Sequence, residues 1–290
     1  MKIRRLLVVL SASIGCLLSG CSSGQEKTVE PKLPAVARAK VTPETKAEEK
    51  PPKEKTPPEK AKPVPAPEKE PEPTPPKEVA KATSDAWAKR GFSPEYMGTD
   101  RSGAVVFASV FHGLRGAVPA FRAESATDDL SLKGLPSPDV PFGLNLSNSK
   151  VTDGGLKALA EYKNLTALDL VFTKVSDAGL KELAKLPNLT SLNLRSTDVT
   201  DLGLKELAGL TRLSALSLAN DKVTDAGLKA LGGMKGLTSL DLGFTDVSDA
   251  GLKELVGLKD LVSLRLELTS VTDAGVQELR KALPKVVVVK

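Results

Sequence analysis

The sequence predicts an α/β solenoid in its C-terminal half, with a parallel β-sheet on a concave side and helices on a convex side. Three observations predict this fold class. One phrase returns every 24 residues, and before it leucines alternate with polar or small residues, as a strand with one buried face requires. After it, apolar residues follow the helical spacing i, i+3, i+4. The valines that mark the phrase are Val151, Val175, Val199, Val223, Val247 and Val271.

Each 24-residue unit is expected to contain one strand and one helix. In "TSLNLRS" the leucines alternate, whereas in "DAGLKELAKL" Leu180, Leu183 and Ala184 have the helical spacing. Neither element can bury its apolar face alone, so the units must stack on one another. The leucine pairs that recur in register are Leu144/Leu146, Leu168/Leu170, Leu192/Leu194, Leu216/Leu218, Leu240/Leu242 and Leu264/Leu266.

The unit L-x-x-L-x-L-x-x-T-x-V-T-D-A-G-L-K-E-L-x-x-L resembles the leucine-rich repeat. The resemblance covers residues 142–290, which we assign to the repeat domain with six copies and a C-terminal cap strand. It implies a solenoid that contacts another protein through its concave face.

The phrase "VSDAGL" indicates the start of a helix. We expect Ser176 or Asp177, and their equivalents, to accept backbone N–H bonds there, and Gly179 to permit close packing of adjacent turns. Stacked aspartates could instead hold calcium, but the capping role already explains them, and we expect no metal site and no cofactor.

A second ladder of short polar residues follows the strands. Such side chains can satisfy backbone groups where the chain leaves a strand, so we interpret the ladder as structural. Its members are Ser149, Thr173, Thr197, Asp221, Thr245 and Thr269.

Both ends of the solenoid need covers, because an open end exposes apolar edges. The C-terminal "LPKVVVVK" predicts a shortened seventh strand, set one residue off register by the extra residue in "LRKAL". Residues 84–141 predict an irregular N-terminal cap, in which "GFSPEYMGTDRSGAVVFASVF" has the pattern of a hairpin.

The N-terminus predicts a lipoprotein signal peptide at residues 1–20. A basic start and a short apolar run lead to Leu18-Ser19-Gly20-Cys21, which resembles the lipobox of bacterial lipoproteins. The resemblance implies lipid attachment at Cys21, and Ser22 after it favours the outer membrane. An ordinary cleaved signal with a chance cysteine is the alternative.

Residues 21–83 predict a disordered linker rich in proline, lysine and glutamate. The signal holds three basic residues, and the linker 13 basic against 11 acidic, which leaves 25 of each in the remainder. A neutral folded part lacks the concentrated basic charge of a nucleic-acid surface, so no nucleic-acid partner is expected.

The concave strand positions supply the candidate binding surface, because their residues vary within a constant frame. A merely solvated face would show the same variation. Mixed charge with exposed Arg and Phe suits a protein partner, which the sequence does not identify. The candidates are Asn145, Asp169, Val171, Phe172, Asn193, Arg195, Ser217, Asp241, Phe244, Arg265 and Glu267.

Catalysis has little support in the sequence. Cys21 would be lipidated, and the single histidine, His112, has no nucleophile motif beside it and is interpreted as a cap residue. We therefore expect a non-enzymatic, monomeric binding module anchored in the bacterial cell envelope. The rival hypothesis is an envelope spacer whose linker contacts or crosses the peptidoglycan.

Overall fold

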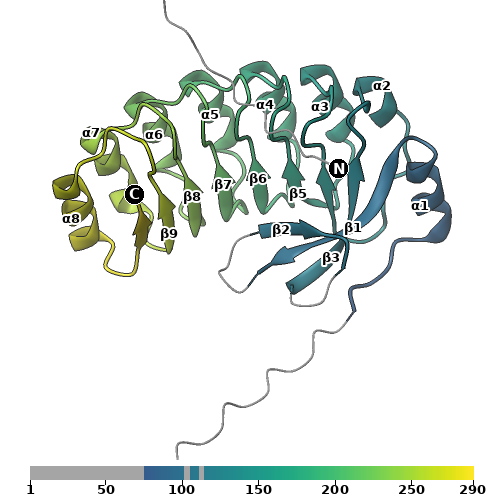
Figure 1. Ribbon diagram of the computed structural model, residues 1–290, viewed down its shortest axis with the longest axis horizontal. Coiled ribbons are helices and arrows are strands. Elements are labelled where there is room, and N and C mark those ends of the chain that lie inside the picture. The colour runs from purple at the N-terminus through teal and green to yellow at the C-terminus, as the bar shows by residue number, and fades with distance from the viewer. Residues whose placement is uncertain (1–74, 101–104, 111–113) are drawn as a thin grey trace, which may run out of the picture. The chain divides into compact units, whose positions relative to one another are not determined.

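The computed structural model describes residues 75–100, 105–110 and 114–290, all within the compact unit Pro67–Lys290. The predicted signal peptide, Cys21, most of the predicted linker and His112 lie outside the described residues. Figure 1 shows the described chain as a row of coils, with the strands side by side and the helices along one side of them.

The predicted α/β solenoid with its parallel sheet is confirmed. Each coil contributes one short strand, and successive strands pair in parallel with the 24-residue register of the sequence, as in Leu168↔Leu192 and Leu216↔Leu240. The parallel strands of the repeats are β4 (Phe142–Asn145), β5 (Leu165–Asp169), β6 (Ser191–Asn193), β7 (Ala215–Ser217), β8 (Ser239–Asp241) and β9 (Ser263–Arg265).

One short helix follows each of these strands. The fifth coil departs from the pattern, since its α-helix is brief and continues as a 3-10 helix. The helices are α3 (Asp153–Leu159), α4 (Asp177–Leu183), α5 (Asp201–Leu207), α6 (Asp225–Leu231), α7 (Asp249–Leu252) with η1 (Lys253–Gly257), and α8 (Asp273–Ala282).

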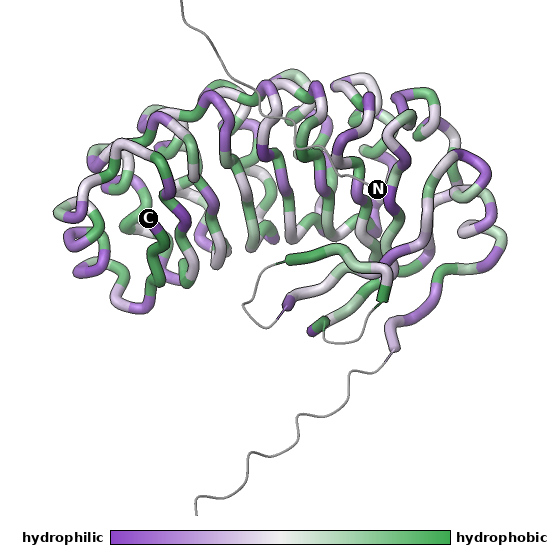
Figure 2. The backbone as a smooth tube through the Cα atoms, viewed as in Figure 1, coloured by the Kyte–Doolittle hydropathy of each residue, from purple (hydrophilic) through white to green (hydrophobic). Residues whose placement is uncertain are grey.

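A continuous apolar core lies between the sheet and the helices. In the fourth coil, for example, Leu216, Leu218, Val223, Leu228 and Leu231 are all at most 2% exposed. Each such side chain contributes about 1.5–3 kcal/mol of burial before the entropy of ordering is subtracted. Figure 2 shows the green, hydrophobic segments recurring along the coils, alternating with purple ones.

The helix starts follow the sequence only in part. Ser176 is the N-cap of α4, and its hydroxyl accepts the Ala178 N–H, as predicted. The aspartate that follows each N-cap residue bonds to the next coil instead of its own helix. Asp153 of α3, for example, accepts the N–H and the hydroxyl of Ser176 at 2.8 and 2.6 Å. The same bridge joins Asp129 to Thr152, Asp177 to Thr200, Asp201 to Thr224, Asp225 to Ser248 and Asp249 to Thr272.

The glycine of the phrase makes room for this bridge, which confirms the predicted close packing. A Cβ on Gly203 would lie 2.4 Å from the Asp177 Oδ1 and 2.9 Å from the Leu180 Cδ1. A side chain at this position would therefore push adjacent coils apart.

The ladder of short polar residues is structural, as predicted. The hydroxyls of Thr173, Thr245 and Thr269 donate to the carbonyls of Leu170, Leu242 and Leu266 at 2.6–2.8 Å.

The predicted C-terminal strand exists as β10 (Val287–Val289), parallel to β9. The expected one-residue register shift is wrong, because Val288 pairs with Leu264, 24 residues earlier. The extra residue is absorbed before the strand: Leu283 and Val286 are buried 25 residues after their equivalents, the buried Leu258 and Leu261.

The N-terminal cap is more regular than its sequence indicated. The predicted hairpin is confirmed, since two of its strands pair antiparallel with Met97 opposite Phe107. A further strand pairs antiparallel with the first and parallel with β4, so one sheet runs β10 to β4 and then β3-β1-β2. The cap elements are α1 (Lys81–Ala88), β1 (Phe92–Thr99), β2 (Val105–Ala108), β3 (Arg115–Ala123) and α2 (Asp129–Leu132).

Together β3 and α2 form a degenerate first coil. Phe121 pairs with Leu144 of β4, and Asp129 at the start of α2 holds the next helix cap as the repeat aspartates do. Trp87 of α1 seals the end of the core, with its ring stacked on Phe121 at 4.6 Å and its Nε1 donating to the Pro136 carbonyl at 2.9 Å.

Candidate functional site

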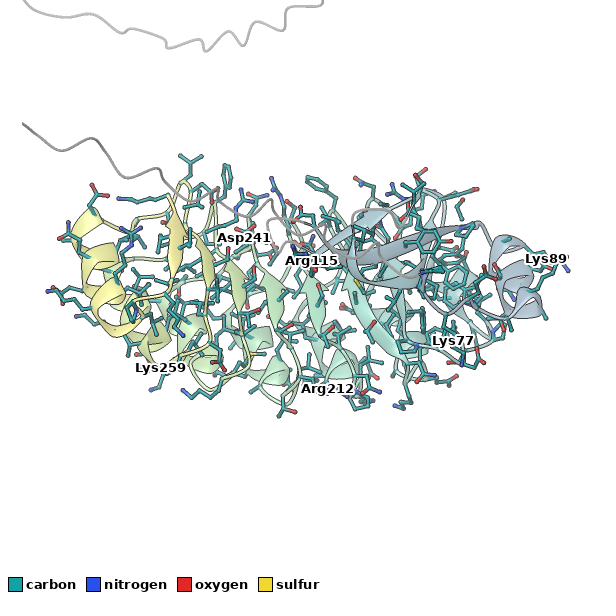
Figure 3. All side chains as sticks on the ribbon, turned by 90° about the horizontal axis from the view of Figure 1, so that it is seen from below. Lys77, Lys89, Arg115, Arg212, Asp241 and Lys259 are labelled. Atoms are coloured by element: carbon teal, nitrogen blue, oxygen red, sulfur yellow. The ribbon has the colours of Figure 1, made fainter. Side chains whose placement is uncertain are left out.

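The predicted concave residues form two adjoining rows across the sheet. The strand pairing places Asp169, Asn193, Ser217, Asp241 and Arg265 side by side in successive strands. Val171, Arg195 and Glu267 form the second row, each two residues after the first-row residue of its coil and just beyond the strand end. Figure 3 views this side of the sheet, with Asp241 toward its C-terminal end.

Several members of the first row have a structural role that the sequence pattern did not indicate. The Asp169 carboxylate accepts the Val171 N–H at 3.0 Å, and the Asp241 carboxylate accepts the Gly243 N–H at 3.0 Å. Asn193 does the same for Arg195 at 3.2 Å. These bonds close the turn where the strand ends, which is a known preference of Asp and Asn.

The cap covers the N-terminal part of the concave face. Met97 packs on Ala167, and Phe107 joins the same small cluster. A Cβ on Gly143 would lie 3.0 Å from both Met97 and Phe107, so this strand can approach the cap only because it has no side chain there. Asn145 is correspondingly 4% exposed, which removes this candidate from the accessible surface.

A groove of about 420 Å³ runs where the cap meets the open strands. Residues of β1, β2 and β3, most of them apolar or glycine, form one wall. Threonine and serine side chains of β5 and of the starts of β6 and β7 form the other. In Figure 3 Arg115, at the start of β3, lies beside this junction. The groove is lined by Met97, Gly98, Thr99, Val105, Arg115, Gly116, Val118, Thr166, Thr190, Ser191 and Ser214.

Charged residues of both signs occupy the concave side. Arg265 and Glu267 form an ion pair at 2.7 Å, and this bond raises the pKa of the arginine and lowers that of the glutamate. Burial raises the pKa of Asp169, while its bonds to Val171 and Asn193 and the charge of Arg122 oppose that shift. Arg195 is exposed and adds to the field that lowers the pKa of Glu267.

Phe172 and Phe244 stand at the rim of this face, 58% and 48% exposed. Both have left-handed backbones, with φ of 55° and 60°. Leu268, which is not among the candidates from the sequence, occupies the same position in its coil with φ of 54° and 76% exposure. Counting 24 residues onward from Phe244 would have found it.

Asp221 is the exception in the buried polar ladder. It is 6% exposed, and its Oδ1 accepts the Thr197 N–H at 2.7 Å and the Thr197 hydroxyl at 3.1 Å. Its other oxygen, Oδ2, is buried without a hydrogen-bond partner. Burial is the main cause that raises the pKa of Asp221 to about 7.

Two further observations on the described part of the chain concern metal binding and membrane spanning. Residues 75–100, 105–110 and 114–290 contain no group of three or more His, Cys, Asp or Glu side chains that could hold a metal ion. In the same ranges no helix has both the length and the apolar character needed to cross a bilayer.

The in-register strands, the buried leucines and the one helix per coil are the architecture of a leucine-rich-repeat solenoid. In agreement, the Leucine Rich repeat family matches residues 144–160, 163–184, 185–208 and 237–256. The chain therefore contains leucine-rich repeats, as the sequence pattern predicted.

Solved structures of bacterial leucine-rich-repeat proteins resemble the chain. Internalin C2 from Listeria monocytogenes is 24% identical over 56% of this chain and 83% of its own, with a TM-score of 0.43. A leucine-rich-repeat protein of Leptospira interrogans is 28% identical over 51% of this chain, also with a TM-score of 0.43. The match spans only 36% of that Leptospira chain. The comparison with curated proteins gave no match.

Proposed function

We propose that the chain is a lipid-anchored leucine-rich-repeat protein of the bacterial cell envelope, and that the open part of its concave face binds another protein without catalysing a reaction. The observation that carries this proposal is the division of the face. The cap covers its first strands, whereas from β6 onward charged side chains are open to solvent.

Some concave residues are explained by the fold alone, and these do not argue for binding. Asp169, Asn193 and Asp241 close turns at the strand ends. Arg195 has no such task, and the Arg265–Glu267 pair is exposed, where an ion pair contributes only about 0–1 kcal/mol to folding. Residues that the fold does not need, gathered on one face, support a contact surface.

The chemistry of the surface favours a protein partner. Arginine and aromatic residues are enriched at protein interfaces, and both occur here. The charges are mixed in sign, with Arg195 and Arg265 beside Asp241 and Glu267, so a partner must match a pattern and not a single charge.

The sequence supports the anchor and the location. Leu18-Ser19-Gly20-Cys21 resembles a lipobox, and two or more acyl chains would hold the protein stably at a membrane. The proline-rich segment at 21–83 would let the folded unit reach away from that membrane. Ser22 after the cysteine favours the outer membrane, and this placement belongs to the same proposal.

Site-specific photo-crosslinking in cells that produce the full chain tests the binding face. A photoreactive amino acid at Ser217 on β7 is expected to give one defined crosslinked protein, whereas the same group at Lys229 on the exposed side of α6 gives none. Arg195→Glu should abolish the crosslink, and Lys229→Glu should leave it unchanged.

Equal crosslinking from both positions, or a crosslink that Arg195→Glu does not affect, contradicts the binding role of the concave face. The spacer hypothesis then becomes the better one. It predicts that replacing residues 22–74 by a Gly/Ser chain of equal length abolishes function in the cell, whereas a binding module tolerates the replacement.

A further inference from the structure

The rim of the concave face carries a row of residues with left-handed backbones, one per coil. Their N–H groups continue the ladder between coils: the Phe172 N–H donates to the Arg195 carbonyl at 3.2 Å, and the Phe244 N–H to the Glu267 carbonyl at 2.7 Å. The stack therefore fixes this conformation whatever the side chain is. The row consists of Asn148, Phe172, Ser196, Asn220, Phe244 and Leu268.

Two of the six residues in the row suit the conformation and three do not. Asn148 and Asn220 are residues that adopt positive φ readily. Bulky residues such as Phe172, Phe244 and Leu268 are disfavoured there, because the Cβ crowds the backbone carbonyl. These three coils thus accept backbone strain that asparagine would relieve.

Burial of these three side chains does not offset the backbone strain. The three side chains are 58%, 48% and 76% exposed, respectively, and none belongs to the apolar core. Strain that no internal contact offsets is typical of functional positions. Resting on the proposed function, we propose that Phe172, Phe244 and Leu268 are anchors for the apolar side of an amphipathic helix of the partner protein, laid along this rim.

The spacing of the anchors fits a helix. Strands lie about 4.8 Å apart, which places Phe244 about 14 Å from Phe172 and Leu268 about 19 Å from it. Helix residues at i, i+11 and i+14 lie within about 40° of one face and about 16 and 21 Å apart along the axis. Each anchor is then matched within about 2 Å.

The polarity of the row fits the same partner. Between Phe172 and Phe244 the rim holds Ser196 and Asn220, which are joined by a hydrogen bond of 3.0 Å. A helix on this rim would place apolar residues over its two ends and polar residues over its middle. Lys222 and Asp198, an exposed ion pair at 3.4 Å, flank that middle part with both charges.

The first test separates function from folding. The triple variant Phe172→Asn, Phe244→Asn, Leu268→Asn of the full chain should melt at a higher temperature than the unmodified chain, by roughly 2–4 °C for each position. Leu202→Asn is the matched control, since Leu202 is 68% exposed on α5 and lacks a left-handed backbone. It should not raise the Tm.

The second test uses a displayed library of 20-residue Ala/Lys/Glu helices that carry leucines at varied positions. Selection on the full chain should enrich leucines at i, i+11 and i+14, and enriched peptides should bind the triple variant at least tenfold more weakly. Leu202→Asn should bind them like the unmodified chain.

Three results would overturn the inference: a triple variant that melts lower or unchanged, enrichment without this spacing, or rim-dependent binding of anionic phospholipid vesicles in place of helices. The proposed function is judged separately. If Arg195→Glu abolishes the cellular crosslink and the triple variant retains it, concave binding stands and the rim assignment fails.

Discussion

The carboxylate of Asp177 accepts both the N–H and the hydroxyl of Thr200, at 2.8 and 2.7 Å, and Thr200 is itself the N-cap of the following helix. A side chain from the first residue of α4 therefore fixes the start of the next helix, α5. The relationship recurs through the solenoid and adds a side-chain link to the backbone hydrogen bonds that join neighbouring coils.

Replacing Asp177 by Ala should destabilise the protein by about 2–3 kcal/mol, because two charge-assisted bonds are lost and the donors of Thr200 are left without an acceptor. Urea unfolding measures the change. Asp198→Ala removes an aspartate that is 60% exposed and bonded only to Lys222, and it should cost less than about 0.5 kcal/mol. Equal effects of the two substitutions would refute the bridging role.

Gly203→Ala should cost about 1–3 kcal/mol, since the new Cβ would meet the Asp177 carboxylate at 2.4 Å. Gly209→Ala is the control, because no atom lies within 4 Å of the added Cβ and its φ is not positive. This control should be neutral or stabilise by about 0.4–1 kcal/mol through the unfolded state. Chemical denaturation of both variants decides the matter.

Asp221 should make the stability pH-dependent. Its pKa is raised from 3.8 to about 7 on folding, so its protonated form is favoured in the folded protein. Its contribution is complete below pH 4 and is lost as the pH rises toward 7, by roughly 2–4 kcal/mol. Asp221→Thr restores the ladder residue and should stabilise the protein more at pH 8 than at pH 5.

Differential scanning calorimetry at these two pH values measures the Asp221 effect. Thr197→Val retains a carboxylate at 221 and should make the protein less stable at pH 8, because it removes the hydroxyl that donates to Asp221 at 3.1 Å. A gain from Asp221→Thr that is identical at pH 5 and pH 8 would show that the carboxylate does not titrate in this range.

The proposed anchor predicts that Cys21→Ser abolishes incorporation of labelled palmitate and moves the protein out of the membrane fraction. Ser22→Asp should leave the label in place and shift the protein toward the inner membrane. Labelling followed by fractionation distinguishes the two effects. Palmitate retained by Cys21→Ser would contradict lipid attachment at this residue.

The repeat domain was largely predictable from its sequence because the same pattern of leucines and polar residues recurs in each coil. Leucine pairs such as Leu192/Leu194 define strands, and the 24-residue period defines their register. The target of the aspartate bonds was not predictable in the same way. A short polar residue at a helix start suits a local cap, and only the stacked structure shows that Asp153 reaches Ser176 in the next coil.

The two ends were predicted less fully than the repeats, because the sequence of each occurs only once in the chain. The sequence of β3 has no leucine pair, so no sequence pattern predicted that Phe121 would take the place of a repeat leucine. For the candidate site, the pattern placed the concave residues of successive coils in rows, as the strand pairing does. It could not show that Met97 and Phe107 pack against Gly143, or that Asn145 is buried. That arrangement depends on contacts between distant segments.

The bridges between coils also bear on how such a protein can change its size. The aspartate of each coil bonds to the N-cap residue of the next coil, and its own N-cap residue bonds to the aspartate of the coil before. A whole 24-residue unit could therefore be inserted between β6 and β9 without altering either end. Each insertion would lengthen the uncovered face by about 4.8 Å while the cap, the groove and the terminal strand stay as they are. The reach of this surface is thus a quantity that gene duplication can adjust one unit at a time.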